Sequence, residues 1–431
     1  MTLNRHRTTS AVTAAWGLFS ALGLLMLGNG LLGTLLGVRS ELEGFATAAT
    51  GVIMASYYAG FLFGSRIAPK TLERVGHVRV FAALASLASA SPLVHSVFVN
   101  PAVWSAMRFI FGFCMAGLYV VAESWLNQAA TNQTRGRLLS VYMLVMMGGL
   151  GVSQLFVGLA APTSFKLFVL ASLFVSLAVV PISLSQGNAP PFHAPETLSA
   201  KTVWHLAPLG IAGGVAAGIA NGALVGIGPV YATRIGLSTS QVAWVMGAAL
   251  FGSVVWQWPI GLMSDHIPRR RALLLVTSVA AFVAVLGAQS NAPGFGYLVA
   301  VMFFFGGLTF PMYSLGLSHI NDVISSNQAV VASSLYVFVS GAGAILGPLL
   351  AAFAIDAMGA RGFFVVLAVT HGLLGAYALY RIVVKKTAVR LEDQTPWRPF
   401  PSRASAVLTR LTKTRRQQNG VDTAKEPSSV G

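Results

Sequence analysis

The stretch Gly261-Leu-Met-Ser-Asp-His-Ile-Pro-Arg-Arg-Arg271 is a short polar turn between two apolar runs, each long enough to cross a lipid bilayer. A second turn, Pro69-Lys-Thr-Leu-Glu-Arg-Val-Gly-His-Val-Arg79, lies 192 residues earlier and is also placed between two such runs. The acid and the last arginine of each turn keep this offset, because Glu73 matches Asp265 and Arg79 matches Arg271. One turn, acidic and then basic, therefore occurs at the same place in two halves of the chain.

The composition around these turns is that of a membrane protein. Hydrophobic residues make up 55% of the 431 residues and charged residues only 9%, whereas soluble domains carry about 25% charged residues. Apolar stretches of about 20 residues, the length that spans a bilayer, follow one another through most of the chain. We therefore predict an all-α polytopic membrane protein with twelve transmembrane helices.

The net charge of +16 raises the question of nucleic-acid binding. With twelve spans and both termini on one side, all but five of the 28 Lys and Arg residues fall on that side. This is the asymmetry that sets membrane topology, so the charge indicates orientation and contact with anionic lipid, and we expect no nucleic-acid partner. We predict a multi-pass protein of the cell inner membrane with cytoplasmic N- and C-termini. The five exceptions are Arg39, Lys166, Arg234 and Arg361 on the opposite side and Arg108 within a span.

The expected organisation has five parts. They are a cytoplasmic N-terminus (1–13), a first six-helix bundle (14–185), a cytoplasmic linker rich in proline (186–203), a second six-helix bundle (204–384) and a basic, disordered cytoplasmic tail (385–431). The expected spans are about 14–36, 46–67, 80–99, 103–122, 138–160, 165–184, 206–228, 241–263, 272–288, 297–317, 329–353 and 362–384.

Residues outside the two turns also repeat between the halves. An even number of spans puts both halves in the same orientation, which predicts parallel repeats with a cavity between them near the middle of the membrane. The matched pairs are Asn29 with Asn221 and Gly60 with Gly252 at an offset of 192, and Tyr119 with Tyr313, Asn127 with Asn321, Tyr142 with Tyr336 and Gly149 with Gly343 at an offset of 194.

These motifs resemble the major facilitator superfamily over about residues 14–384. The superfamily's loop signature, Gly-x-x-x-Asp-Arg-x-Gly-Arg-Arg, is similar to Gly261, Asp265, Arg269 and Arg270, and more distantly to Glu73, Arg74 and Gly76. The fourth span has Arg108-Phe-Ile-Phe-Gly112, similar to the superfamily's Arg-x-x-x-Gly motif. The stretches around Glu123-Ser124, Arg135–Leu139 and Gln257–Gly261 resemble the YcaD-like branch.

The resemblance implies a fold with two six-helix pseudo-repeats and a set of charges that hold the two halves together on the cytoplasmic side. An acid beside arginines makes charge-assisted hydrogen bonds there, while the alternative is that these charges only set topology in water, where one pair contributes ~0–1 kcal/mol. We call this set the cytoplasmic latch, and it comprises Glu73, Arg74, Arg79, Glu123, Asp265, Arg269 and Arg270.

Arg108 is the single Lys or Arg that falls well inside an expected span, away from its ends. Placing it at a helix centre costs at least ~2.5 kcal/mol unless it meets a partner or water, so we expect it to face the central cavity. It would contact an anion there or take part in proton coupling. The alternative is a structural hydrogen-bonding role, or a side chain that reaches the membrane surface.

Other polar residues in the spans are candidates for binding a solute. Asn29 and Asn221 lie on the first and seventh spans, which in the superfamily line the cavity with the fourth and tenth; the alternative is hydrogen bonding between helices, commonly ~1 kcal/mol or less. The weaker candidates are Tyr119, Gln154, Gln257, Tyr313 and Tyr336, and packing is the alternative for the aromatic ones.

The expected function follows from the resemblance together with these residues. We predict a monomeric secondary transporter that moves a small organic solute by alternating access, with export favoured over uptake, and no enzymatic activity, cofactor or metal. The single cysteine, Cys114, excludes an intrachain disulfide and a cysteine-cluster metal site. Proton coupling stays open, with Glu123 at a helix end as the candidate carboxyl group. A receptor that does not transport, built on the same fold, is the alternative.

Overall fold

The computed structural model describes residues 15–131, 134–184, 207–289, 294–324, 329–384, 391–394 and 397. In this part of the chain the regular structure is helical. The expected N-terminal segment 1–13, the linker 186–203 and most of the tail 385–431 lie outside the described residues.

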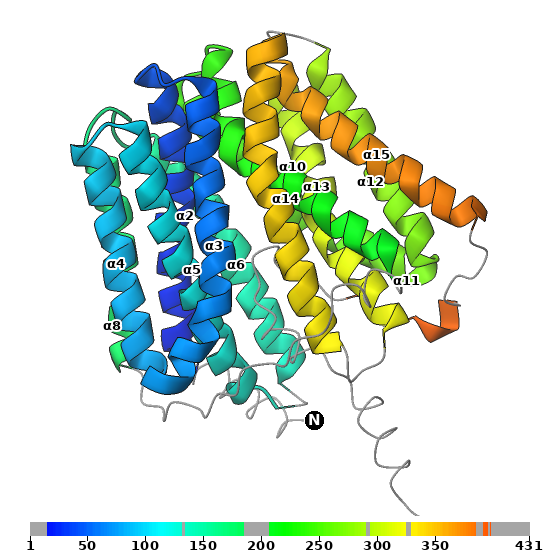
Figure 1. The fold of residues 1–431 in the computed structure, drawn as a ribbon, viewed down its shortest axis with the longest axis horizontal. Coiled ribbons are helices and arrows are strands. Elements are labelled where there is room, and N and C mark those ends of the chain that lie inside the picture. The colour runs from blue at the N-terminus through cyan, green and yellow to red at the C-terminus, as the bar shows by residue number, and fades with distance from the viewer. Residues whose placement is uncertain are drawn as a thin grey trace, which may run out of the picture.

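Two groups of six membrane-crossing helices make up the protein, side by side in Figure 1 as blue to cyan-green and green to orange. The first group, which we call the N-half, contains α2 (Trp16–Leu42), α3 (Thr47–Val75), α4 (His77–Val97), α5 (Pro101–Ala129), α6 (Arg135–Val157) and the pair α7 (Lys166–Leu177) and α8 (Val179–Leu184). The second, the C-half, contains α10 (Pro208–Arg234), α11 (Thr239–His266), α12 (Arg269–Ala288), α13 (Phe295–Val323), α14 (Ala329–Met358) and α15 (Gly362–Val384). A short 3₁₀ helix, η1 (Leu391–Asp393), follows.

Eleven stretches of the described chain are long and apolar enough to cross a membrane, the α7–α8 pair counting as one. The twelfth crossing helix, α3, has 29 residues and includes Thr47, Thr50, Tyr57 and Tyr58, which lower its hydropathy. The sixth span divides between α7 and α8 because Pro181 has no amide hydrogen to bond the carbonyl of Leu177, where α7 ends.

Local sequence explains where several helices begin. The Asn100 side chain accepts hydrogen bonds from the amides of Ala102 and Val103, and Pro101 takes the first helical position of α5. Ser238 and Gln241 form a capping box at the start of α11. Between α3 and α4 a single residue, Gly76, reverses the chain at φ 90°, a backbone conformation that residues with a side chain rarely adopt.

The internal repeat is visible in the closest helix contacts. A Cβ atom at Gly60 on α3 would overlap the carbonyl oxygen of Phe109 on α5, and one at Gly252 on α11 would overlap that of Phe303 on α13. The same holds for Gly112 against Tyr57 and Gly306 against Ala249. Equivalent glycines at offsets of 192 and 194 therefore join equivalent helices in each half, as two pseudo-repeats require.

The halves meet mainly along three pairs of helices, α3 with α14, α2 with α10, and α6 with α11, with smaller contacts of α3 with α10 and α2 with α11. At one end of the molecule the contacts are close, because a Cβ atom at Gly37 would lie 2.8 Å from Pro229 and one at Gly51 would lie 2.8 Å from Ala352. Figure 1 shows α3 and α14 side by side at the top and α14 leaning away towards the bottom. We call the closely packed end, where α2 and α10 finish, the closed end.

Candidate functional site

A cavity of about 80 Å³ lies between the two halves. Its walls come from α2, α3, α5 and α6 of the N-half and from α10, α11, α13 and α14 of the C-half. The sequence predicted a space between the halves, and we call this space the central cavity. Its polar lining residues are Asn29, Thr34, Tyr57, Tyr58, Arg108, Gln154, Asn221 and Ser340.

Asn29 and Asn221 occupy matching positions on α2 and α10, one from each half. Both are buried, with 4% and 6% of their surface exposed. Nδ2 of Asn29 and both polar side-chain atoms of Asn221 form no hydrogen bond to any residue that the structure describes. A buried amide without a hydrogen bond costs about 1–3 kcal/mol, so these groups are poised to bond a polar molecule in the cavity.

Arg108 on α5 lines the central cavity and is 5% exposed. Its guanidinium carbon lies 4.6 Å from the centre of the Tyr57 ring on α3, a cation–π contact. Among the residues that line the cavity, Arg108 is the charged one. A guanidinium in this position can attract an anionic group.

Gln154 on α6 forms part of the same wall. The Thr34 hydroxyl on α2 donates a hydrogen bond of 2.9 Å to Oε1 of Gln154, and Nε2 of Gln154 lies 3.1 Å from the Ser153 hydroxyl. These bonds hold the amide between α2 and α6, so Gln154 is oriented before any solute arrives.

The other four candidates lie outside the central cavity. Tyr119 is fully buried with its hydroxyl 3.5 Å from the sulfur of Met26. Tyr336 donates to the carbonyl oxygen of Tyr313 at 2.9 Å, and the two rings pack 4.9 Å apart inside the C-half. Gln257 is half-buried on α11 and is not among the cavity-lining residues. The structure thus brings Asn29, Arg108, Gln154 and Asn221 together and leaves these four apart from them.

The closed end holds a charge cluster that the sequence analysis did not single out. Arg234, at the end of α10, donates from Nε and Nη2 to the two carboxylate oxygens of Glu41 on α2, at 2.9 and 3.1 Å. Asp356 on α14 lies 4.0 Å from the same guanidinium. The charge pattern of the sequence placed Arg234 on this side of the membrane. Its pairing with Glu41 depends on α2 and α10 ending at the same level, which the sequence does not show.

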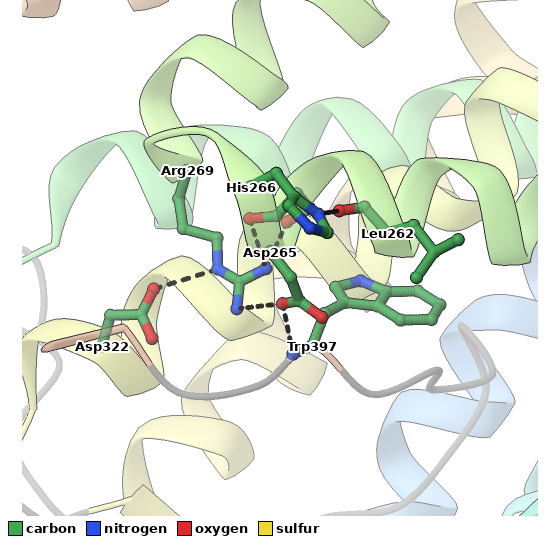
Figure 2. A network of polar contacts seen from close by, with 7 residues as sticks. Leu262, Asp265, His266, Arg269, Asp322 and Trp397 are labelled. Atoms are coloured by element: carbon green, nitrogen blue, oxygen red, sulfur yellow. Dashed lines mark hydrogen bonds and ion pairs between the residues drawn. The ribbon is translucent and has the colours of Figure 1, made fainter. Parts of the chain in front are cut away.

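Within the C-half, three latch candidates lie at the end opposite the closed end, and Figure 2 shows the contacts of two of them, Asp265 and Arg269. Arg269 is buried and donates to Asp322 at the end of α13, 3.1 Å away, and to Asp265 at 3.3 Å. It also donates to the hydroxyl of Ser264. The side chains of Arg269 and Asp322 are 1% and 0% exposed, so their pairing stabilises the turn between α11 and α12. Arg270 beside them is half-buried.

The tail returns to this turn. The backbone amide of Trp397 donates to Oδ1 of Asp265 at 2.7 Å, and its indole ring covers Gly261 so closely that a Cβ atom there would overlap it. Figure 2 shows the Trp397 ring beside Asp265 and Leu262. A contact 132 residues apart in sequence is not visible in any local pattern.

The latch candidates of the N-half lie in two places. Glu73, Arg74 and Arg79 are exposed around the α3–α4 turn. Glu123 on α5 is fully buried and accepts a hydrogen bond of 2.6 Å from the Tyr142 hydroxyl on α6. Glu123 thus joins two helices of one half in this structure.

Comparisons with known proteins agree with this geometry. The model of the Major Facilitator Superfamily matches residues 209–418, and that of the Sugar (and other) transporter family matches residues 6–184. The chain is 30% identical over 341 residues to an uncharacterized MFS-type transporter of Enterobacter sp. strain 638, covering 77% of this chain and 86% of that one. It is 27% identical over 333 residues, with the same coverage, to the uncharacterized MFS-type transporter YcaD of Escherichia fergusonii.

Solved structures share the fold. A variant of the nucleoside transporter NupG superposes with a TM-score of 0.71 at 12% identity, covering 85% of this chain and 99% of that chain. A bacterial homolog of the human lysosomal transporter Spinster, inward-facing and unoccupied, gives a TM-score of 0.67 at 14% identity, covering 90% and 99%. The chain belongs to the major facilitator superfamily, and the YcaD proteins are among its relatives. It is a multi-pass membrane transporter.

Proposed function

We propose that this protein is a secondary active transporter that moves a small organic solute through the central cavity by alternating access. The observation that carries the proposal is the pair Asn29 and Asn221. One buried amide from each half faces the same space, with donor or acceptor atoms unused by any described residue. A solute that bonds both amides interacts with both halves at once, so its binding energy can drive their relative movement.

We also propose that the structure corresponds to the inward-facing state in the inner membrane. The Lys and Arg asymmetry supports cytoplasmic termini, and with that orientation Glu41, Arg234 and Asp356 lie on the outer side. The halves pack closely at that end through Gly37 and Gly51. In the outward-facing state the cytoplasmic latch, with Glu73, Arg74, Arg79, Glu123, Asp265, Arg269 and Arg270, would close the opposite end.

Export is the direction that we propose. Its support is analogy with the superfamily: Gly343-x-x-x-Gly347-Pro348 on α14 resembles the glycine- and proline-containing motif that drug/proton antiporters carry in the fifth span, where this chain has Gln154 in place of the proline. Proton coupling belongs to the same proposal. Glu123 is the carboxyl group we assign to it, because this side chain is fully buried yet held by the Tyr142 hydroxyl, which can donate to the carboxylate or accept from the carboxylic acid.

The test begins with a thermal-shift screen of the purified protein against metabolites and drugs. Any compound that stabilises the wild type is then measured on Gly33→Leu and on Asn221→Ala. Gly33 lines the central cavity and has open space around its Cβ position, so a leucine there fills the cavity without displacing a neighbour. We expect Gly33→Leu to abolish the shift and Asn221→Ala to weaken binding about tenfold, the effect of losing one hydrogen bond of ~1–1.5 kcal/mol.

The matched control is Gly372→Leu on α15, an exposed glycine that also has no neighbour within contact distance of its Cβ position. This variant should behave as the wild type does. If the Gly33→Leu protein still binds every stabilising compound with unchanged affinity, the central cavity is not the site and the proposal fails.

A further inference from the structure

A second hollow lies beside the central cavity, on the outside of the seam between α6 and α11. Its volume is about 810 Å³. Its floor consists of small residues, among them Gly148, Gly151 and Gly247, and its rim of exposed apolar side chains such as Trp244 and Phe251. We call this hollow the lateral groove. In a transporter that spans the bilayer, such an apolar surface faces lipid.

Three side chains line both spaces. Met147 and Gln154 of α6 and Leu250 of α11 belong to the wall of the central cavity and also to the wall of the lateral groove. The partition between the polar cavity and the lipid-facing groove is therefore one side chain thick at this point. Methionine, glutamine and leucine are unbranched at Cβ, so Met147 and Leu250 can change rotamer without a backbone movement. Gln154 can do the same once its hydrogen bonds to Thr34 and Ser153 are broken.

The length of the groove fits a hydrocarbon chain. Along α6 its lining runs from Leu144 to Gly158, which at 1.5 Å per residue is about 21 Å. One leaflet of a bilayer has a hydrocarbon thickness of about 15 Å, half of the ~30 Å core. An extended lipid-like chain thus fits in the groove over its whole length.

One of the two spaces is polar and the other apolar, which matches the two ends of an amphiphile. The groove is apolar apart from Ser240 and Gln154. The central cavity offers the positive charge of Arg108. It also offers Nδ2 of Asn29 and both polar side-chain atoms of Asn221, and these three atoms form no hydrogen bond within the described chain. A charge or amide bonds a headgroup, whereas the groove holds only a chain.

We infer that the transported solute is a single-chain amphiphile with an anionic headgroup, which passes between the central cavity and the bilayer through the lateral groove past Met147, Gln154 and Leu250. This inference rests on the proposed function and names the class of its solute. The headgroup bonds Arg108 and the two asparagines while the chain still lies between α6 and α11, so the molecule never has to leave the membrane for water.

The experiment uses the full-length protein in liposomes with a sixteen-carbon fatty acid that carries a photoreactive diazirine in its chain. After irradiation, the labelled peptides are identified by mass spectrometry. The inference predicts labels on groove residues of α6 and α11 and also on cavity-lining residues of α2 and α10. The fatty alcohol with the same chain and diazirine should label the groove but not the cavity, and Arg108→Gln should remove this difference between the two probes.

Glycine variants test the groove and the cavity separately. Gly151→Trp fills the groove, since the Cβ position of Gly151 has nothing within contact distance, and it should reduce labelling of the cavity at least fivefold. Gly33→Leu should remove the cavity labels and keep the groove labels. Gly372→Trp, on the exposed face of α15, should change neither. Gly148→Leu is a second groove variant with the same open surroundings, in case Gly151→Trp does not fold.

Two outcomes would overturn the inference. Cavity labels that persist at wild-type level when the groove is filled would show that the probe arrives by another route. Labels spread equally over the lipid-facing surface, α15 included, would show only the surrounding lipid. In either case, if a water-soluble compound still stabilises the wild type and not Gly33→Leu, the central cavity remains a solute site and the inference alone has failed.

Discussion

Arg234 and Glu41, 193 residues apart, form a two-bonded ion pair that joins the N-half to the C-half at the closed end. The side chains of Arg234 and Glu41 are 30% and 21% exposed, so water screens the ion pair. The pair therefore stabilises the closed end by about 1 kcal/mol. An energy of this size suits a contact that must break when the transporter changes between its two states. It favours one state several-fold, and a bound solute can still overcome it.

Removing this ion pair should move the balance towards the state in which the closed end opens. We expect Arg234→Ala to shift the population up to about fivefold, the equivalent of ~1 kcal/mol. The measurement is the distance between spin labels on Leu42 and Arg361, two exposed positions near that end in different halves, by double electron–electron resonance. The longer distance should gain weight in the variant.

Arg39→Ala is the control for this prediction. Arg39 is a neighbouring arginine whose partners, Glu43 and the carbonyl oxygen of Pro162, both belong to the N-half. Its loss should leave the distance distribution unchanged. An Arg234→Ala distribution identical to that of the wild type would mean that the ion pair does not bias the two states.

The buried pair of Arg269 and Asp322 should matter for stability rather than for the balance between states. Asp322→Asn leaves the Arg269 guanidinium with less compensation in a site where both side chains are almost fully buried. Breaking such a pair costs about 3–5 kcal/mol, so the midpoint of thermal unfolding in detergent should fall clearly. Arg271→Gln, on an exposed arginine of the same turn, should leave the midpoint unchanged. Equal midpoints for Asp322→Asn and the wild type would contradict the structural role.

Gly261 and Trp397 should be coupled in a double-mutant cycle. In the wild type, Gly261→Ala places a methyl group against the Trp397 indole and should destabilise the protein. In a Trp397→Ala background the same change should be neutral or stabilising by up to ~1 kcal/mol, because alanine favours a helix over glycine. Chemical unfolding of the four proteins measures the coupling.

Gly247→Ala is the control on the same helix, where a Cβ atom would make only ordinary contacts, at 3.8 Å and beyond, with Gln154. It should have the same small effect with and without Trp397. Additive effects of Gly261→Ala and Trp397→Ala would show that the tail does not rest on α11 in solution.

Most of the fold could be predicted from the sequence, because apolar length and charge asymmetry are strong signals. The twelve spans and the repeat at offsets of 192 and 194 are confirmed, and Gly60 and Gly252 make equivalent contacts. The helices run further than the apolar runs: α3 reaches Val75 and α13 reaches Val323. Apolar length reports only the part within hydrocarbon, so the polar turns that lie beyond it are missed.

The site was harder to predict because sequence does not fix how a helix is rotated about its axis when all its faces are apolar. Asn29 and Asn221 could be placed by the repeat, and Arg108 by the cost of burying a charge. The same reasoning does not separate Gln154, which lines the cavity, from Gln257, which does not. The repeat matches Tyr313 and Tyr336 to Tyr119 and Tyr142, but it does not show whether they face the cavity. In the structure Tyr313 and Tyr336 pack against each other inside the C-half.

The interlocked glycines of each half have a mechanical consequence. Gly60 contacts the backbone of α5, and Gly252 contacts the backbone of α13, with no room for a methyl group at either place. Such close packing opposes sliding of one helix along the other, so each half is expected to tilt as a rigid body. α3 has 29 residues and is therefore about 43 Å long. If α3 tilts by about 10° about a pivot near Glu41 and Arg234, its far end moves by about 7 Å. A movement of that size changes the width of the opening between the two halves by about the diameter of a small molecule.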